Sequence, residues 1–166
     1  MVKTKTLWRV MLWVLTLAWG GTILGMSLQS GPQSTALSSG FTAWFLHLFK
    51  AYNALPEAQQ LQVLAQAQAV VRELAHVAEY TLFGFFVSSL WRSYRTCRFS
   101  LWSFLSAAVF AVVDECLQEF VSVGRAFQVI DLAKDWLGIA LGIGCTWVVC
   151  LVIKRITLLK DVSKWQ

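Results

Sequence analysis

The chain has 166 residues, of which 57% are hydrophobic and only 14% are charged, and its mean hydropathy is +0.60. A soluble domain usually carries about 25% charged residues, so this composition excludes an ordinary soluble protein and predicts a polytopic membrane protein. We expect one all-α domain over residues 1–166. The net charge of +5 fits a protein that faces an anionic inner leaflet, and we expect no nucleic-acid partner.

Four apolar stretches have the length of a membrane-spanning helix. A helix of about 20 residues crosses the hydrocarbon core, and each stretch is close to this length. The first is longer than the apolar core of a signal peptide and no cleavage site follows it, so we interpret it as an uncleaved helix. The predicted spans of this helix bundle are residues 7–28, 74–91, 99–121 and 130–153.

The segment 29–73 separates the first two spans and is predicted to be external. It opens with QSGPQSTALSSG, whose Gly, Ser and Pro residues predict a loop. FTAWFLHLFKAY follows at residues 41–52 with helical spacing of its apolar side chains, which predicts an amphipathic helix lying in the membrane interface. Pro56 should end this helix. The Ala- and Gln-rich stretch after it favours a helix that runs into the second span.

The basic residues orient the four predicted spans. Ten of the 14 Lys and Arg residues precede the first span, separate the second from the third, or follow the fourth. Four helices put these three positions on one side, and the positive-inside rule makes that side cytoplasmic. We therefore expect both termini in the cytoplasm, with residues 154–166 as a cytoplasmic tail. The ten are Lys3, Lys5, Arg9, Arg92, Arg95, Arg98, Lys154, Arg155, Lys160 and Lys164.

The acidic residues gather on the opposite side. Of the nine, only Asp161 falls in the cytoplasmic tail. Polar residues near the outer ends of three spans repeat at helical spacing, so each set shares one helix face. Such faces are costly against lipid, and we expect them to face one another in a shared pocket near the outer leaflet. The sets are Arg72, His76 and Glu79; Asp114 and Gln118; Glu115 and Glu119; and Asp131 and Asp135.

Three blocks of this sequence resemble the signature blocks of the VanZ-like family, in the right order over nearly the whole chain. They are MSLQSGPQSTALS, RELAHVAEYTLFGF and DECLQEFVSVGRAFQVIDLAKDWLGIALG. Leu117, Val123 and Asp135 depart from the His, Pro and Asn that many members have there. The resemblance implies a bacterial inner-membrane protein associated with teicoplanin resistance, and it implies no particular chemical activity. The matching positions are Ser27, Gln29, Ser30, Ser34, Arg72, His76, Glu79, Tyr80, Asp114, Glu115, Gln118, Gly124, Arg125, Asp131, Asp135, Gly138 and Gly142.

Spacing and resemblance together predict a catalytic set of four residues. His76 can act as acid or base near neutral pH, and Glu79 lies one turn away to orient it. Asp114 and Glu115 would form a second acid–base pair or hold a divalent cation such as Mg²⁺ or Ca²⁺. Arginines can hold a phosphate or carboxylate with two hydrogen bonds, and they belong to the predicted substrate-binding set. That set is Gln29, Ser30, Arg72, Tyr80, Gln118, Arg125, Asp131 and Asp135.

The sequence leaves several functions open for this pocket. We expect the protein to act on or bind a lipid or a lipid-linked cell-envelope component, such as a cell-wall precursor, at the outer leaflet. A non-catalytic binding protein and a small-substrate or proton transporter are the alternatives. The charged groups could also be a structural network that holds the helices together. Gly138 and Gly142 form a G-x-x-x-G spacing, which predicts close packing against a neighbouring helix.

Overall fold

The computed structural model describes residues 2–94, 98–124 and 126–162, and all secondary-structure elements within them are α-helices. The all-α class is therefore confirmed. In chain order the helices are α1 (Val2–Ser27), α2 (Gly31–His47), α3 (Lys50–Asn53), α4 (Glu57–Ser93), α5 (Phe99–Phe120) and α6 (Val129–Val162).

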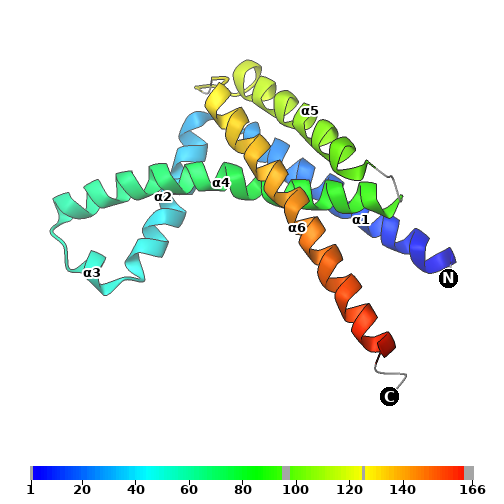
Figure 1. Cartoon of the computed structure of the whole chain (residues 1–166). Helices are drawn as coiled ribbons and strands as arrows, with labels where there is room; N and C mark the ends of the chain where they lie inside the picture. The colour runs from blue at the N-terminus through cyan, green and yellow to red at the C-terminus, as the bar shows by residue number, and fades with distance from the viewer. Residues whose placement is uncertain (1, 95–97, 125, 163–166) are drawn as a thin grey trace.

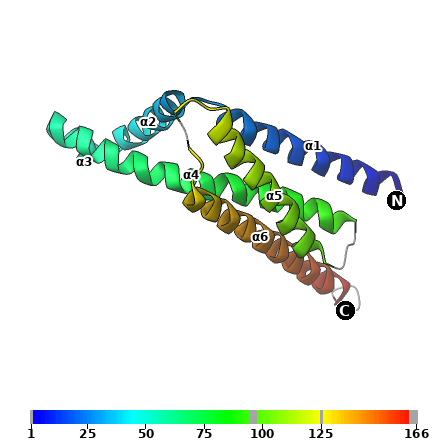
Figure 2. The ribbon, with the colours of Figure 1, turned by 90° about the horizontal axis from the view of Figure 1, so that it is seen from above.

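Helix α4 is the centre of the fold, since it packs against α6, α5, α1 and α2. The two ends of the described chain and the turn from α4 to α5 lie at one end of the bundle (Figures 1 and 2). The α1–α2 turn and the α5–α6 connection lie at the opposite end. From there α2, α3 and the first half of α4, residues 31–73, project away from the bundle as a helical arm.

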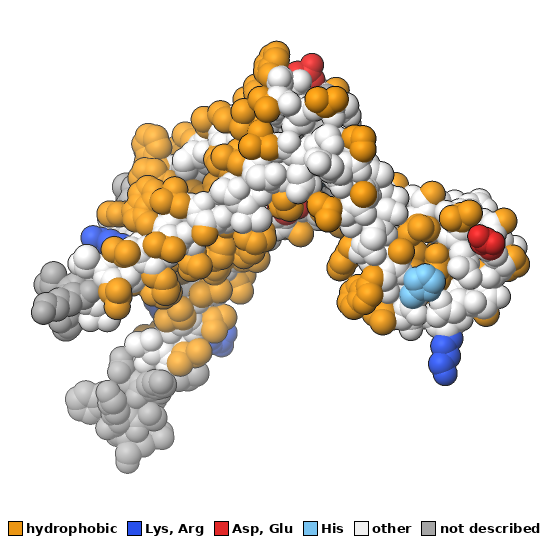
Figure 3. All heavy atoms as spheres, turned by 180° about the vertical axis from the view of Figure 1, so that it is seen from behind, with side chains coloured by type: hydrophobic (Ala, Val, Ile, Leu, Met, Phe, Trp, Pro, Cys, Tyr) orange, Lys and Arg blue, Asp and Glu red, His pale blue; other side chains and the backbone are white. Residues whose placement is uncertain are grey.

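Three helices contain stretches that are long and apolar enough to cross a membrane: Thr4–Ser27, Phe99–Phe120 and Val129–Leu158. Hydrophobic side chains are spread over the face of the bundle that Figure 3 shows, as expected for helices that face lipid. The predicted span 74–91 forms the second half of α4 but is not among these three. His76 and Glu79 make it more polar than the other spans, and the count of four stays a prediction.

The predicted loop at the start of the external segment is wrong, because α2 begins at Gly31. Ser30 lies at its N-cap, and the Ser30 backbone N–H donates to Gln33 Oε1 at 3.1 Å. Pro32 occupies the first turn, where its missing N–H costs nothing. These start signals outweigh the glycine and serine content of the segment.

The expected helix over residues 41–52 is split in two, since α2 ends at His47 and α3 covers Lys50–Asn53. Pro56 then forms the N-cap of α4. From Glu57 this helix continues without a break to Ser93, so the predicted run from the external segment into residues 74–91 is confirmed.

The predicted G-x-x-x-G surface of α6 packs directly on α4. A Cβ atom added to Gly138 would lie 2.6 Å from Val77 O, and one added to Gly142 would collide with Thr81 O. From the other side, a Cβ on Gly84 would lie 2.7 Å from Ile139 O. The two helix backbones are therefore as close as glycine allows.

A second close contact joins the α1–α2 turn to the α5–α6 connection. The Gly31 N–H donates to Val123 O at 3.0 Å, and a Cβ on Gly31 would lie 2.7 Å from Gly124 O. Gly124 has a φ of +78°, which glycine adopts readily. This contact fixes the position of α2 relative to α5 and α6, and so shapes the site between them.

Candidate functional site

The structure brings the predicted polar faces of α4, α5 and α6 together where the arm leaves the bundle. Polar and charged groups that would face lipid at great cost are instead packed against one another. His76 is half-buried beside them. The buried members of this cluster are Tyr80, Asp114, Glu115, Gln118, Asp131 and Asp135.

Asp114 is held by side chains from other helices as well as its own. The Tyr80 hydroxyl on α4 donates to Asp114 Oδ2 at 3.0 Å. Gln118 Nε2 donates to the same oxygen at 3.3 Å and to the Ser27 hydroxyl at the end of α1 at 3.2 Å. The Ser122 hydroxyl donates to the Ser27 carbonyl. These bonds join α1, α4 and α5 into one hydrogen-bonded unit.

His76 lies between two carboxylates of α6. Its Nδ1 is 3.2 Å from Asp135 Oδ1, and its Nε2 is 4.0 Å from Asp131 Oδ2. Asp135 is fully buried, so it is fixed by its surroundings and can hold the imidazole ring in one orientation. An oriented imidazole that remains partly accessible is suited to moving a proton.

The acidic residues around this centre have other partners. Lys134 binds Asp131 Oδ1 at 2.7 Å and also pairs with Glu73. Glu115 accepts the backbone N–H of Gln128 at 3.1 Å. Lys134 is therefore already neutralised by two carboxylates and offers little charge to a ligand.

Three buried carboxylate oxygens have no hydrogen-bond partner in the described part of the chain: Asp114 Oδ1, Glu115 Oε1 and Asp135 Oδ2. Each belongs to the polar cluster. Buried polar atoms are rarely left unpaired, and an exception calls for a proton, a water molecule or a ligand. Over the same residues no group of three or more His, Cys, Asp and Glu side chains is arranged to hold a metal ion.

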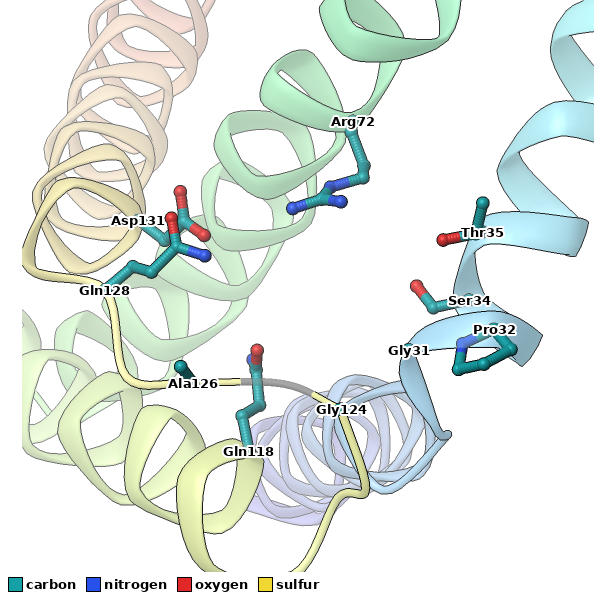
Figure 4. A pocket seen from close by; sticks show the side chains of 10 residues that line it. All are labelled: Gly31, Pro32, Ser34, Thr35, Arg72, Gln118, Gly124, Ala126, Gln128 and Asp131. Carbon is teal, nitrogen blue, oxygen red and sulfur yellow. The ribbon is translucent and has the colours of Figure 1, made fainter.

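Two cavities adjoin the cluster, and Figure 4 shows the side chains around the first. This cavity has a volume of about 560 Å³, and its wall is mostly polar. Arg72 points into it from α4, Gln118 from α5, and Ser34 and Thr35 from α2 (Figure 4). The remaining wall residues are Gly31, Pro32, Gly124, Ala126, Gln128 and Asp131.

The second cavity, of about 370 Å³, is lined by three of the four catalytic candidates, His76, Glu79 and Asp114, whereas Glu115 lines neither cavity. Three wall residues, Ser34, Arg72 and Gln118, are shared with the first cavity, so the two cavities adjoin. Both volumes fall in the range of roughly 300–1,000 Å³ that is usual for ligand pockets. The polar part of this wall also contains Ser27, Gln29, Ser38, His76, Glu79 and Asp114, and the apolar part contains Met26, Leu37, Phe41, Val71 and Ala75.

Several predicted residues have a position that spacing alone did not indicate. Gln29 lines the second cavity, whereas Ser30 starts α2 beside the wall residue Gly31. Asp135, predicted to bind substrate, contacts His76 and lines neither cavity. Arg125 lies outside the described residues.

Most of the cavity wall lies outside the predicted set, and two of its polar members show why. Ser34 lies one turn after Ser30, and recognising the helix start at Ser30 would have placed both on one helix. Gln128 is in the connection before α6, where no periodicity gives a signal.

Three long apolar helices and a buried polar cluster beside two cavities define a helical membrane protein with a ligand-sized site at one end of its bundle. The model of the VanZ/LLP1 family matches residues 12–152, and the chain belongs to this family. No curated protein matches the chain, and no solved structure does.

Proposed function

We propose that this protein binds the anionic headgroup of a lipid or lipid-linked cell-envelope component at the outer leaflet of the bacterial inner membrane. The proposal depends on Arg72. Its side chain borders both cavities and, among the described residues, it makes no hydrogen bond or ion pair with the others. An uncompensated guanidinium between two cavities favours a phosphate or carboxylate ligand, which it can hold with two parallel hydrogen bonds.

The polar groups near Arg72 support the same ligand class. Ser34 and Gln118 share both cavity walls with it and can donate hydrogen bonds to an anionic oxygen. Lys134, in contrast, is occupied by Asp131 and Glu73. Among the described residues that line the cavities, Arg72 is therefore the cation available to a ligand.

The pair of His76 and Asp135 supports chemistry on the bound component. His76 lines the second cavity together with Arg72, and Asp135 would act as its positioning residue through the 3.2 Å contact. A proton could thus be given to, or taken from, a group next to the bound anion. Transfer or hydrolysis at the headgroup is the reaction type that suits this arrangement. The same geometry also suits binding without chemistry, such as shielding of a cell-wall precursor.

The topology in this proposal has four spans, with residues 74–91 of α4 as the second. The basic residues near the termini and the α4–α5 turn favour a cytoplasmic location for that end of the bundle. The site then lies at the outer leaflet, and the arm lies along the membrane surface with exposed Phe41, Trp44 and Phe45 in the interface. A link to teicoplanin resistance is part of the proposal because an outer-leaflet site is where a cell-wall precursor would be met.

Cysteine labelling of intact cells checks this topology. With the four native cysteines replaced by alanine, we expect Gln62→Cys in the arm to react with a membrane-impermeant maleimide added outside. Thr4→Cys at the start of α1 should react only after the cells are opened. Both positions are exposed in the structure. Labelling of Gln62→Cys only in opened cells would place the site on the cytoplasmic side and contradict the proposal.

Replacing Arg72 with glutamine tests the function itself. The purified protein is incubated with bacterial lipid extract, and mass spectrometry then profiles both the retained lipids and any new products. We expect Arg72→Gln to reduce the retained anionic lipid about tenfold, since a charge-assisted hydrogen bond contributes roughly 1.5–3 kcal/mol. Lys5→Gln removes a positive charge away from the site and serves as the control.

His76→Gln in the same assay separates catalysis from binding. We expect this variant to retain the lipid but to lose the product that the unchanged protein forms. Retained lipid without a product in any sample would favour the non-catalytic form of the proposal. Unchanged retention of anionic lipid by Arg72→Gln would overturn the proposal as a whole.

A further inference from the structure

The lining of the second cavity is of two chemical kinds. Its polar residues include His76 and Glu79 on α4 and Asp114 on α5. Its apolar residues, called the apolar wall below, are Met26 at the end of α1, Leu37 and Phe41 on α2, and Val71 and Ala75 on α4. A site for a small, fully polar ligand would not need this apolar wall. Its residue types suit a hydrocarbon chain.

The apolar wall continues onto the outside of the protein. Leu37 and Phe41 line the cavity, yet they are 63% and 56% exposed. The cavity therefore opens at this edge of α2. Trp44 and Phe45, one turn further along the same helix, are also exposed, and Trp44 contacts the ring of Phe41 at 5.9 Å between centroids. An apolar strip thus leads along α2 to the cavity.

Arg72 lines both cavities, and Val71 and Ala75 of the apolar wall flank it on α4. The two cavities therefore combine an exposed apolar edge, a cation and a polar compartment. A phospholipid has three matching parts: hydrocarbon chain, phosphate and polar headgroup. Charge complementarity at Arg72 selects an anionic amphiphile over a neutral one.

We infer that the ligand is a phosphate-bearing lipid that reaches the site sideways from the leaflet, past Leu37 and Phe41. Its phosphate binds Arg72, the first part of one acyl chain lies against Leu37, Phe41 and Val71, and its headgroup occupies the first cavity. This inference rests on the proposed function and specifies its ligand. It also accounts for the exposed apolar strip of α2, which guides the chain from the membrane into the cavity.

Photolabelling of the full chain in phosphatidylcholine vesicles tests this binding mode. The probe is lysophosphatidic acid with a diazirine in the first part of its acyl chain, and peptide mass spectrometry locates the label. We expect labels on α2 at Leu37 and Phe41 and on α4 at Val71. Unlabelled lysophosphatidic acid should compete about tenfold better than a monoacylglycerol of the same chain, which lacks only the phosphate. Glycerol 3-phosphate, which lacks only the chain, should also compete weakly.

A matched pair of variants tests the apolar wall. Leu37→Asp should reduce labelling several-fold, whereas Leu61→Asp on α4 should leave it unchanged. Leu37 and Leu61 are equally exposed, at 63% and 62%, but only Leu37 lines the cavity, so any effect on folding is matched. Equal labelling in both variants, or competition by glycerol 3-phosphate as strong as that by lysophosphatidic acid, would overturn the acyl-chain position while leaving headgroup binding intact. If the Arg72→Gln variant is labelled as strongly as the unchanged protein, both this inference and the proposed function are overturned.

Discussion

Replacing Gly142 with leucine is expected to prevent the protein from folding. A Cβ atom at this position would collide with Thr81 O and would lie 2.5 Å from Phe85 N and 2.9 Å from Gly84 C. All three are backbone atoms, so no side-chain rotation relieves the collision and α6 must move away from α4. Overpacked side chains cost about 1–3 kcal/mol when neighbours can shift, and this collision should exceed that range. Size-exclusion chromatography with Trp fluorescence on heated samples would measure the loss.

Gly144→Leu is the control for this prediction. The residue lies two positions further along α6, and a Cβ atom there meets nothing within 4 Å. Both variants raise the hydropathy of the span equally, so their membrane insertion should be alike. We expect Gly144→Leu to melt within a few degrees of the unchanged protein. Similar melting of the two variants would mean that α4 and α6 do not pack as closely as the structure indicates.

The G-x-x-x-G spacing predicts a packed face on α6 but not the helix that packs against it. Gly138 and Gly142 lie four residues apart in an apolar run, and that spacing was enough to predict a packed helix face. The spacing does not identify the helix that packs against this face, because any helix with a smooth face could do so. The structure assigns α4, whose Gly84 provides the matching close approach. Helix faces are readable from periodicity, whereas pairings depend on the whole bundle.

Local signals compete in the external segment, and the loop prediction followed the wrong one. The glycine and serine content of residues 29–40 predicts a loop. The spacing of Ser30 and Gln33, with Pro32 between them, is a helix-start signal and is the one that the structure follows. Consequently α2 is long enough to reach the site, and Ser34 and Leu37 become wall residues.

In the candidate site, too, the sequence predicts which residues share a helix face but not which residues meet across helices. Helical spacing correctly grouped His76 with Arg72 and Asp131 with Asp135 on shared faces. It suggested Glu79, near in sequence, to orient His76, and it did not indicate that Asp131 and Asp135 lie 4.0 Å and 3.2 Å from the His76 ring across the helix interface. Which carboxylate meets which base depends on helix rotation and depth. Those quantities are set by glycine contacts such as Gly84 on Ile139 rather than by the polar residues themselves.

Asp114→Leu is expected to lower the free energy of unfolding by about 2–5 kcal/mol. The side chain of Asp114 is buried and accepts hydrogen bonds from the Tyr80 hydroxyl and from Gln118. Leucine removes the acceptor and leaves the buried Tyr80 hydroxyl and one Gln118 N–H without this partner, and each buried unsatisfied group costs roughly 1–3 kcal/mol. Asp114→Asn keeps an acceptor oxygen and should cost less. Thermal and denaturant unfolding in a mild detergent would measure these differences.

The variant with both Tyr80→Phe and Asp114→Leu decides whether the lost hydrogen bond is the cause. Phenylalanine removes the donor that Asp114→Leu leaves unpaired, so the double variant should be more stable than Asp114→Leu alone. If it is less stable, the two residues contribute through packing, and the bond of 3.0 Å matters little. The outcome also bears on function, because a cluster whose members merely hold helices together should lose stability at every position. We expect His76→Gln to lower stability less than Asp114→Leu does, since His76 is half-buried and glutamine keeps a donor for the buried Asp135.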